Sequence, residues 1–591
     1  MELVALYIHD FNGVSDSFIS VNSSFNASYN SKHLTVNVGT DRKSYYDGVP
    51  STLLIGQNGS GKTTILTFIE DFYYDNENSG FMVWYTGNEF LIMGKGIVPS
   101  QVSSKNKYNL LYVNAQIFDE FSVYSIKSNN TMDFSSYLFG ERKATAKKFM
   151  DISLNNTKKR ISDKKIEVDK ILKYIKSKKP LPDTLANREL SILSKVTLST
   201  GEFSKRILSN ISFREKYEYE LVLFFNTLYK RYKVSRGNFN TGSVYFQFVN
   251  HDNLKSYSLF KRENWGLSVF PFIFNQLTIK NKKLSLNDVL LSSILSALLS
   301  YVKKVKIQKE HFELLYLKVV LLAYFSSAKE LINDVEQLMR ASIPYSFDDK
   351  DYSNLIRLDR NIQLITDFVN LSYEFCEKIN ISANTVNFTI TSSDHVTKLI
   401  EMSNKLPKEL DSIFNIEWSG LSSGEISLLH LLSSINAAVE KVNIRESAKS
   451  VILLLDEIDL YLHPEWQRTI LSNLLNLINS ININVKIQII ASSHSPIVAS
   501  DFLPVDIVTL SRTASRRINS GTLEEVGFGE PIDKTMSQGF FLKSTVGDRV
   551  FAVIEYLVKN RGNKKVLQQY AHIISLIKNK MLMHILRGKN D

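Results

Sequence analysis

The stretch LLIGQNGSGKTT, residues 53–64, joins an apolar run directly to a loop with three glycines and a lysine. It fits a spacing of glycine, four residues, glycine, lysine and threonine, in which backbone N–H groups curl around a phosphate. Strand-like TLLI before the loop and helix-like TTILTFIEDFY after it supply the context that this motif needs. A flexible Gly/Ser turn is the alternative, and this context disfavours it.

The residue types of the loop match the chemistry of a nucleotide phosphate chain. Lys62 would reach the β- and γ-oxygens, and the Thr63 hydroxyl would ligate Mg²⁺. The positive N-terminal end of the following helix would strengthen anion binding. The residues expected to bind ATP here are Gly56, Gln57, Asn58, Gly59, Ser60, Gly61, Lys62, Thr63 and Thr64.

A second motif, VILLLDEIDLYLHPEWQ at residues 451–467, is an apolar strand that ends in two acidic residues. Asp456 would hold Mg²⁺, and Glu457 would orient and deprotonate an attacking water. An acidic turn after a strand is common by itself. Together with the lysine loop upstream, it predicts a site for hydrolysis of a nucleoside triphosphate.

A third motif, IIASSHSP at residues 489–496, is a strand that runs into a histidine. Parallel α/β folds place their chemistry at the carboxyl ends of the strands, so His494 is expected beside the same site. An isolated histidine is more often structural. The position of this one after the acidic pair favours a contact with the γ-phosphate, and we expect catalytic roles for Lys62, Glu457 and His494.

A fourth motif, LSSGEISLLHLL at residues 421–432, begins a helix with two serines, a glycine and a glutamate. Serine hydroxyls and backbone N–H groups at a helix N-terminus can form an anion site. The alternative is an ordinary N-terminal cap with Glu425 in the first helical turn. In isolation the motif favours that alternative.

The chain changes its pattern twice. It is rich in strand-like runs before about Arg142, and such runs return after about Asn415. Between these points helical periodicity dominates, with strand-like interruptions near Ser243 and Asn384. We expect an α/β head split by a mainly helical insertion domain, with the limits 1–141, 142–415 and 416–591.

Composition narrows the class of protein. With 591 residues, 44% of them hydrophobic, the chain can form two or more domains, and its net charge of +11 modestly favours a polyanionic partner. A single cysteine excludes an internal disulfide and suits a reducing cytosol. The apolar runs from Val289 and Leu314 are too short or carry a lysine, so we expect no membrane span and a cytoplasmic location.

In chain order, the lysine loop, a long insert, LSSGE, LLLDEIDLYLHPEWQ and SSHSP resemble the ABC-type ATPase heads of the RecF, SMC and OLD-like superfamily. The LHPEWQ and SHSP details look closest to ATPases of bacterial antiphage systems, including the Septu ATPase subunit PtuA. The resemblance covers roughly the first 120 and last 180 residues. It implies an ABC-type P-loop ATPase head, with a mixed sheet flanked by helices and with ATP and Mg²⁺ as ligands.

The resemblance also implies roles for residues outside the lysine loop and the acidic pair. Ser422 and Gly424 would form the signature motif and touch the γ-phosphate bound by the partner protomer. Asp459 would lie in the D-loop and cross the dimer interface. Gln116, in LLYVNAQIFDE, would sense Mg²⁺ and the attacking water.

The implied function is an ATPase whose two heads close on two sandwiched ATP molecules and open on hydrolysis. The protein would form a head-to-head homodimer or a higher even oligomer. In an antiphage defence system this cycle would control a separate effector protein, expected to be a nuclease, and DNA or RNA is a further candidate partner.

Two other function classes compete with this one. A DNA-repair or recombination ATPase of the RecF/SMC type stays open. The nucleotide-binding subunit of a membrane transporter is disfavoured by the long insert between the lysine loop and LSSGE. A nuclease within this chain is not expected, because the residues after His494 are few for a Toprim domain and contain no Asp-x-Asp element.

Overall fold

The computed structural model describes residues 1–74, 79–112, 117–129, 148–153, 161–177, 179–181, 185, 190–197, 349–381, 385–406, 410, 413–444, 448–481, 485–523, 547–577 and 585–586. Contacts divide the chain into two compact units, Met1–Ser153 with Ala438–Asp591, and Leu154–Ala437. The domain limits at 141/142 and 415/416 stay predictions. The strand expected near Ser243 and the apolar runs from Val289 and Leu314 lie outside the described residues.

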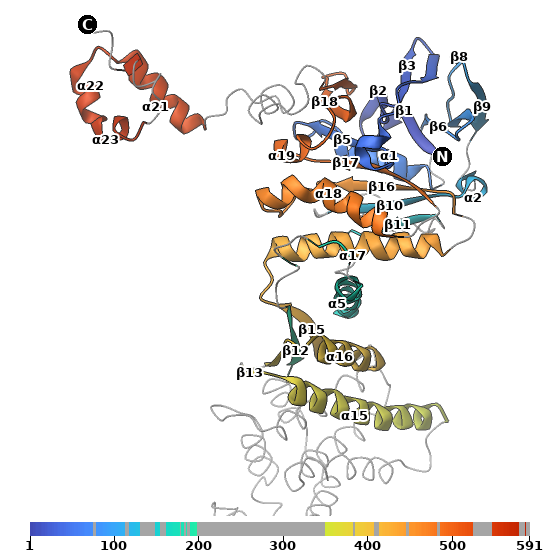
Figure 1. Ribbon diagram of the computed structural model, residues 1–591, viewed down its shortest axis with the longest axis vertical. Helices are drawn as coiled ribbons and strands as arrows, with labels where there is room; N and C mark the ends of the chain where they lie inside the picture. The colour runs from blue at the N-terminus through green and yellow to red at the C-terminus, as the bar shows by residue number, and fades with distance from the viewer. Residues whose placement is uncertain are drawn as a thin grey trace, which may run out of the picture. The chain divides into compact units, whose positions relative to one another are not determined.

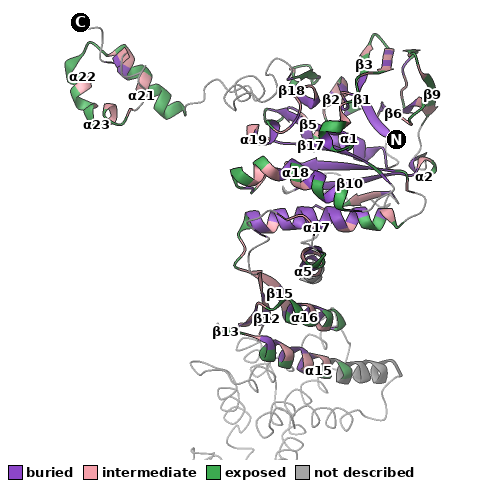
Figure 2. Cartoon of the chain, viewed as in Figure 1, coloured by how far each residue is buried: buried purple, intermediate pink, exposed green. Residues whose placement is uncertain are grey.

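A seven-stranded sheet forms the centre of the first unit (Figure 1). All neighbouring strands in it are parallel except the last pair. Several of its strands are buried along their whole length (Figure 2), as expected for apolar strands covered on both faces. In order across the sheet, the strands are β11 (Phe149–Asp151), β10 (Val123–Asn129), β16 (Ser450–Asp456), β17 (Lys486–Ser492), β5 (Ser51–Gly56), β18 (Ile507–Arg512) and β19 (Ile518–Thr522).

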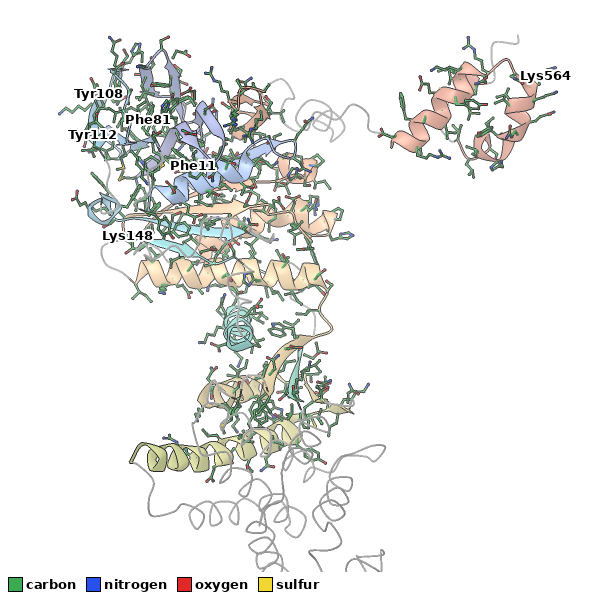
Figure 3. All side chains as sticks on the ribbon, turned by 180° about the vertical axis from the view of Figure 1, so that it is seen from behind. Phe11, Phe81, Tyr108, Tyr112, Lys148 and Lys564 are labelled. Carbon is green, nitrogen blue, oxygen red and sulfur yellow. The ribbon has the colours of Figure 1, made fainter. Side chains whose placement is uncertain are left out.

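Two further sheets complete the strand-rich part of this unit. The five-stranded sheet has the order β2 (Val14–Ser20), β1 (Glu2–Phe11), β6 (Ser79–Tyr85), β7 (Glu89–Lys95) and β9 (Lys107–Tyr112). The three-stranded sheet has the order β3 (Phe25–Asn30), β4 (His33–Val38) and β8 (Gln101–Ser103). Tyr108 and Tyr112 of β9, at the edge of the five-stranded sheet, are exposed (Figure 3).

Helix α1 (Lys62–Asp71) packs between the central and five-stranded sheets. Ile65 and Phe68 share one apolar core with Leu54 of β5 and Ile452 of β16, and the ring centroids of Phe68 and Phe11 lie 5.4 Å apart. Because β1 alternates its side chains between two faces, it contributes to this core and to a second core against the three-stranded sheet. The start of α1 is thereby fixed at the end of β5.

Short and amphipathic helices complete the described part of the first unit. Helix α18 (Pro464–Ser480) buries Ile470, Leu474 and Ile478, which recur at helical spacing on one face. Proline at its first position and His463 as its N-cap fix where it begins. The other helices in the described residues of this unit are η1 (Lys43–Tyr46), α2 (Ile117–Phe121), α19 (Pro496–Ala499), η5 (Pro504–Asp506), α21 (Asp548–Lys559), α22 (Lys564–Gln569) and α23 (Ala571–Ile574).

The second unit combines an antiparallel sheet with long helices. The sheet has the order β13 (Lys378–Ile381), β14 (Thr385–Ile390), β12 (Ser191–Thr197) and β15 (Phe414–Ser419). Among the residues that the structure describes, its helices are α5 (Ile161–Lys176), α15 (Asp349–Phe375), α16 (Ser393–Lys405) and α17 (Ser423–Asn443), the last of which begins in this unit. Phe368, Phe388 and Phe414 lie in its core. The strand-like run near Asn384 forms β14.

The α/β class expected from the sequence is confirmed, with mixed sheets flanked by helices. Within the described residues, none of the helices combines the length and apolar character needed to span a membrane.

Candidate active site

The lysine loop joins the end of β5 to the start of α1, as its sequence predicts. Gly61 is the N-cap of α1 with a φ of +103°. At Gly56, an added Cβ would lie 2.4 Å from the carbonyl oxygen of Leu510 on β18, closer than side-chain atoms approach a backbone. Close packing against a neighbouring strand therefore requires glycine there, whereas the space next to Gly59 is open.

Lys62 is the charged group of this loop and is buried, with 6% of its surface exposed. Its Nζ donates hydrogen bonds to the carbonyl oxygens of Gly56 at 2.9 Å and Gln57 at 3.3 Å. Burial lowers the pKa of the Lys62 ammonium, while the carboxylates of Asp456, Glu457 and Asp459 act in the opposite direction. The lysine and all three acids thus lie within electrostatic reach of one another.

The outer side of the loop is open to a ligand. Gln57, Asn58 and Gly59 are exposed, and the side chain of Thr63 is exposed in the first turn of α1. The buried Oγ of Ser60 makes no hydrogen bond to any described residue. A loop with free backbone surface and an unsatisfied hydroxyl fits a polyoxyanion such as a phosphate chain.

Asp456 ends strand β16 and is held by the two neighbouring strands. Its Oδ1 accepts a hydrogen bond from the Ser492 hydroxyl at the end of β17. Its Oδ2 accepts one from Asn129 Nδ2 at 3.3 Å, and Asn129 lies opposite Asp456 at the end of β10. Three parallel strands therefore fix the direction of one carboxylate at their common carboxyl edge.

Glu457 leaves the strand through a turn with a φ of +52°, which is uncommon for a residue other than glycine. Its backbone N–H donates to Ser492 Oγ at 2.9 Å, which holds the turn in place. The side chain is half-buried. Burial, and then the carboxylates of Asp456 and Asp459, raise the pKa of Glu457, while Lys62 lowers it. A carboxylate with a raised pKa is a better base.

His494 and Asp459 are joined by the turn that follows β17. Asp459 Oδ1 accepts hydrogen bonds from Ser493 Oγ at 2.7 Å and from the His494 backbone N–H at 3.3 Å. Burial, followed by the Lys62 ammonium, lowers the pKa of His494, and Asp459 and Asp456 raise it. The lowered pKa favours the neutral imidazole at neutral pH.

The LSSGE segment precedes α17 and forms a reciprocal N-terminal cap. The Ser422 backbone N–H donates to Glu425 Oε2 at 2.6 Å, and the Glu425 N–H donates to Ser422 Oγ at 3.3 Å. This is the capping-box geometry of the structural alternative. Ser422 itself is exposed and Gly424 is buried. Their role toward a partner protomer stays a prediction, and Gln116 lies outside the described residues.

Sequence reasoning did not single out two residues of this site, Asn129 and Ser492. Ser492 lies within the quoted IIASSHSP motif, where a polar residue at the carboxyl end of an apolar strand was the available signal. Asn129 ends the mixed run VYSIKSN, which gives no such signal, and its partner lies 327 residues away. Its contact with Asp456 depends on strand order, which spacing alone does not reveal.

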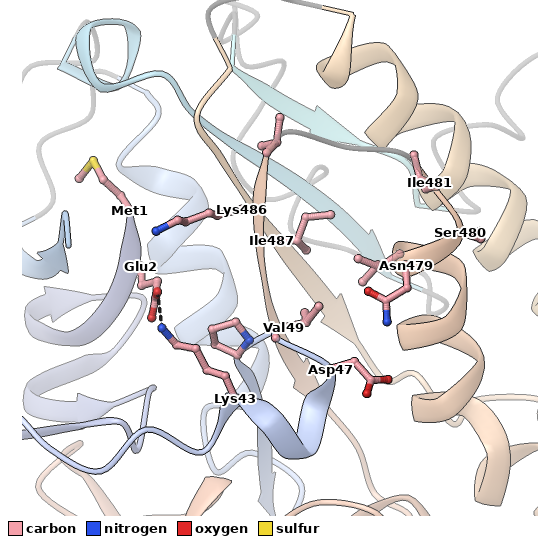
Figure 4. A pocket seen from close by; sticks show the side chains of 14 residues that line it. Met1, Glu2, Lys43, Asp47, Val49, Asn479, Ser480, Ile481, Lys486 and Ile487 are labelled. Carbon is pink, nitrogen blue, oxygen red and sulfur yellow. Dashed lines mark hydrogen bonds and ion pairs between the residues drawn. The ribbon is translucent and has the colours of Figure 1, made fainter.

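A cavity of about 690 Å³ lies at the opposite, amino edge of β5 and β17 (Figure 4). It is lined by Val49 and Pro50 before β5, by the start of β17, and by Lys43, which pairs with Glu2 at 2.6 Å. Because parallel strands carry Lys62, Asp456 and His494 at their other ends, this cavity is distinct from the candidate active site.

Comparison with known proteins agrees with this geometry. The family model described as an AAA ATPase domain matches residues 1–499. A relative named Retron Vc95 probable ATPase, from Vibrio cholerae serotype O1 biovar El Tor, is 42% identical over 92 residues, which are 15% of this chain and 15% of that protein. The family match spans the lysine loop, the acidic strand and His494. The chain therefore belongs to the AAA ATPase domain family.

Proposed function

We propose that this chain hydrolyses ATP with Mg²⁺ at the carboxyl edge of its central sheet, and that this reaction drives head-to-head association. The observation that carries the proposal is the convergence of Lys62, Asp456, Glu457 and His494. Lys62 and Asp456 both act on the pKa values of Glu457 and His494, although the lysine lies almost 400 residues from the acidic pair.

The lysine loop supplies what a triphosphate needs. The N-terminal turn of α1 offers backbone N–H groups and a positive dipole end, and Lys62 adds a full positive charge. Because Lys62 is bound only to neutral carbonyl oxygens among the contacts described above, it can exchange them for phosphate oxygens. Charge-assisted bonds to the phosphates would replace weaker neutral ones.

The donor set also fits Mg²⁺. Thr63 and Asp456 provide hard oxygen ligands, and the described residues hold no cluster of three acidic, histidine or cysteine side chains that would bind a metal without the nucleotide. When bound, Mg²⁺ would neutralise phosphate charge. Asn129 and Ser492 would keep the Asp456 carboxylate directed toward it.

Hydrolysis requires a base and a stabiliser of developing negative charge. Glu457, with its raised pKa, would orient an attacking water and accept its proton. Lys62 would stabilise the charge on the γ-phosphoryl oxygens, and neutral His494 would donate a hydrogen bond to them. These roles rest on side chains of one unit.

We further propose that two heads close on two ATP molecules, with Ser422, Gly424 and Asp459 reaching the nucleotide of the partner protomer. The exposure of Ser422, and of Tyr461 two residues after Asp459, supports a surface available for such contacts. An even number of heads would follow from this arrangement.

The cellular role we propose is antiphage defence in the cytoplasm, where the ATPase cycle controls a separate effector, a nuclease. The partial relative, which is named a retron probable ATPase, supports this choice, as does the resemblance to the Septu subunit PtuA. A repair ATPase of the RecF/SMC type is the alternative, and the net charge of +11 suits DNA or RNA in either case.

The first test is phosphate release from ATP by the purified protein and by Lys62→Ala. We expect the parent to hydrolyse ATP and the variant to lose activity by about 100-fold or more, because the charge on the phosphates is lost. The loop backbone should persist, so circular dichroism should be unchanged. Parent-like turnover by a folded Lys62→Ala protein would refute the assignment of the site.

A further inference from the structure

The side chain of Gln467 connects two loops that carry the candidate catalytic residues. Gln467 lies in the first turn of α18 and is half-buried. Its Nε2 donates to the carbonyl oxygens of Leu462 at 3.0 Å and Asp459 at 3.4 Å, both in the D-loop, defined here as residues 457–463. Its Oε1 accepts a hydrogen bond from Ser495 Oγ at 2.6 Å.

Ser495 belongs to the switch loop, defined here as residues 493–495, which follows β17 and contains His494. The same loop binds the D-loop a second time, because Ser493 Oγ and the His494 N–H both donate to Asp459 Oδ1. The backbone of Asp459 is thus held by Gln467, and its carboxylate is held by the switch loop.

A purely local role does not account for all of these contacts. A residue in the first turn of a helix often satisfies a nearby carbonyl oxygen, which would explain the bond to Leu462. It does not explain the bond to Ser495, 28 residues further along the chain. An amide is also the side chain that can donate to one loop and accept from the other at the same time.

We propose that Gln467 is a positioning residue for ATP hydrolysis, and that its amide fixes the D-loop against the switch loop so that Glu457, Asp459 and His494 keep one relative geometry. The inference rests on the proposed ATPase function. Gln467 touches neither the lysine loop nor Asp456 in the contacts described, so its loss should impair the chemical step and leave ATP binding intact.

Two substitutions separate its hydrogen bonds from its volume. Gln467→Glu keeps the shape and the acceptor for Ser495 but loses the N–H donors, and Gln467→Met keeps the approximate volume but loses both. The matched control is Arg468→Ala, since Arg468 is the next residue on the same helix, is exposed and pairs with Glu465.

Hydrogen exchange of the nucleotide-free protein gives the first readout. We expect peptides that cover residues 457–463 and 493–495 to exchange faster in both Gln467 variants, with no change elsewhere and none in Arg468→Ala. Faster exchange throughout the first unit would instead show a general stabilising role and overturn the proposal, as would unchanged exchange in the two loops. If Gln467→Met does not fold, the nearly isosteric Gln467→Glu decides the outcome.

Steady-state kinetics give the second readout. We expect kcat to fall about tenfold or more in Gln467→Glu while the KM for ATP stays within about twofold of the parent value. Parent-like kcat in a folded Gln467→Glu protein would overturn the proposal. A parent protein that hydrolyses no ATP would contradict the proposed function instead, and hydrogen exchange would still decide whether Gln467 holds the two loops.

Discussion

At Glu457, burial and two neighbouring carboxylates oppose ionisation, while the Lys62 ammonium favours it. The net raised pKa makes the ionised side chain costly in the folded protein. Catalytic residues often lower the stability of the folded protein in this way. The burial and like charges that raise the pKa of a catalytic base also destabilise its ionised form.

The direct test of this residue is Glu457→Gln. We expect the variant to bind ATP normally, since Lys62, Thr63 and Asp456 are unchanged, but to hydrolyse it about 100- to 10,000-fold more slowly because an amide is a poor base. Nucleotide binding and phosphate release measured on the same sample distinguish the two steps. Hydrolysis at the parent rate would remove Glu457 from the mechanism.

The same substitution predicts a pH-dependent gain in stability. Above the raised folded pKa, the parent carries a half-buried ionised carboxylate, which lowers its free energy of unfolding. The melting temperature of Glu457→Gln should therefore be about 1–2 °C higher at neutral pH. The gain should fade as the pH falls through the folded pKa and vanish below the ordinary glutamate value, where both states are protonated. Melting curves of the nucleotide-free proteins check this, and a gain that grows on acidification would contradict it.

The residues closest to the expected chemistry were predictable because their signals are local. Lys62 is defined by glycine spacing, and Asp456 and Glu457 by the end of an apolar run. Asn129 and Gln467 were not, since each acts through a partner on another strand or loop. A polar side chain at a strand end or in a first helical turn has many possible partners until the strand order is known.

At the scale of elements, the junction of β5 and α1 leads to a prediction about glycine. Gly56→Ala would force a Cβ against the Leu510 carbonyl oxygen, and we expect a loss of about 1–3 kcal/mol in the free energy of unfolding. Gly59→Ala is the matched control. It has open space at the Cβ position and a φ of +80°, so only backbone strain of about 1 kcal/mol is expected.

Urea denaturation of the two variants measures this difference. An equal loss in the free energy of unfolding for Gly56→Ala and Gly59→Ala would show that the backbone moves to relieve the contact with Leu510 of β18. Packing against β18 would then not be the reason for glycine at position 56.

Three strands of the seven-stranded central sheet were predictable, but their neighbours in the sheet were not. Long apolar runs gave β5, β16 and β17, and the lysine motif gave α1. The place of β17 between β5 and β16 depends on contacts across a long separation in sequence. The parallel pairing of β7 with the nearby edge strand β9 depends on the chain passing through β8 between them, which periodicity does not predict. Periodicity reports which face of a strand is buried, but not which strand lies beside it.

At the scale of the whole molecule, the proposed closure of two heads can be tested by light scattering. Glu457→Gln should accumulate a dimer or larger even oligomer when ATP is added, because bound ATP persists. Adding Ser422→Arg should return the protein to its nucleotide-free association state. If ATP-dependent association persists in the double variant, the role of Ser422 in the partner's site is wrong even if the ATPase assignment holds.

The cap formed by Ser422 requires a control for folding. Ser422→Asp keeps a good N-cap acceptor for the Glu425 N–H and should leave thermal stability close to that of the parent. Its negative charge should repel a γ-phosphate and also block association. If Ser422→Asp associates normally with ATP while Ser422→Arg does not, steric disruption of the loop, not phosphate contact, explains the arginine variant.

The order of the central sheet has a consequence for synthesis on the ribosome. Strand β5 pairs on its two sides with β17 and β18, which are made roughly 430 residues after it, and at about 5–20 residues per second this delay is on the order of 20–90 s. During that time it lacks both of its neighbouring strands. The nascent chain should therefore depend on chaperones to shield β5, and its yield should fall when translation is slowed between residues 56 and 486.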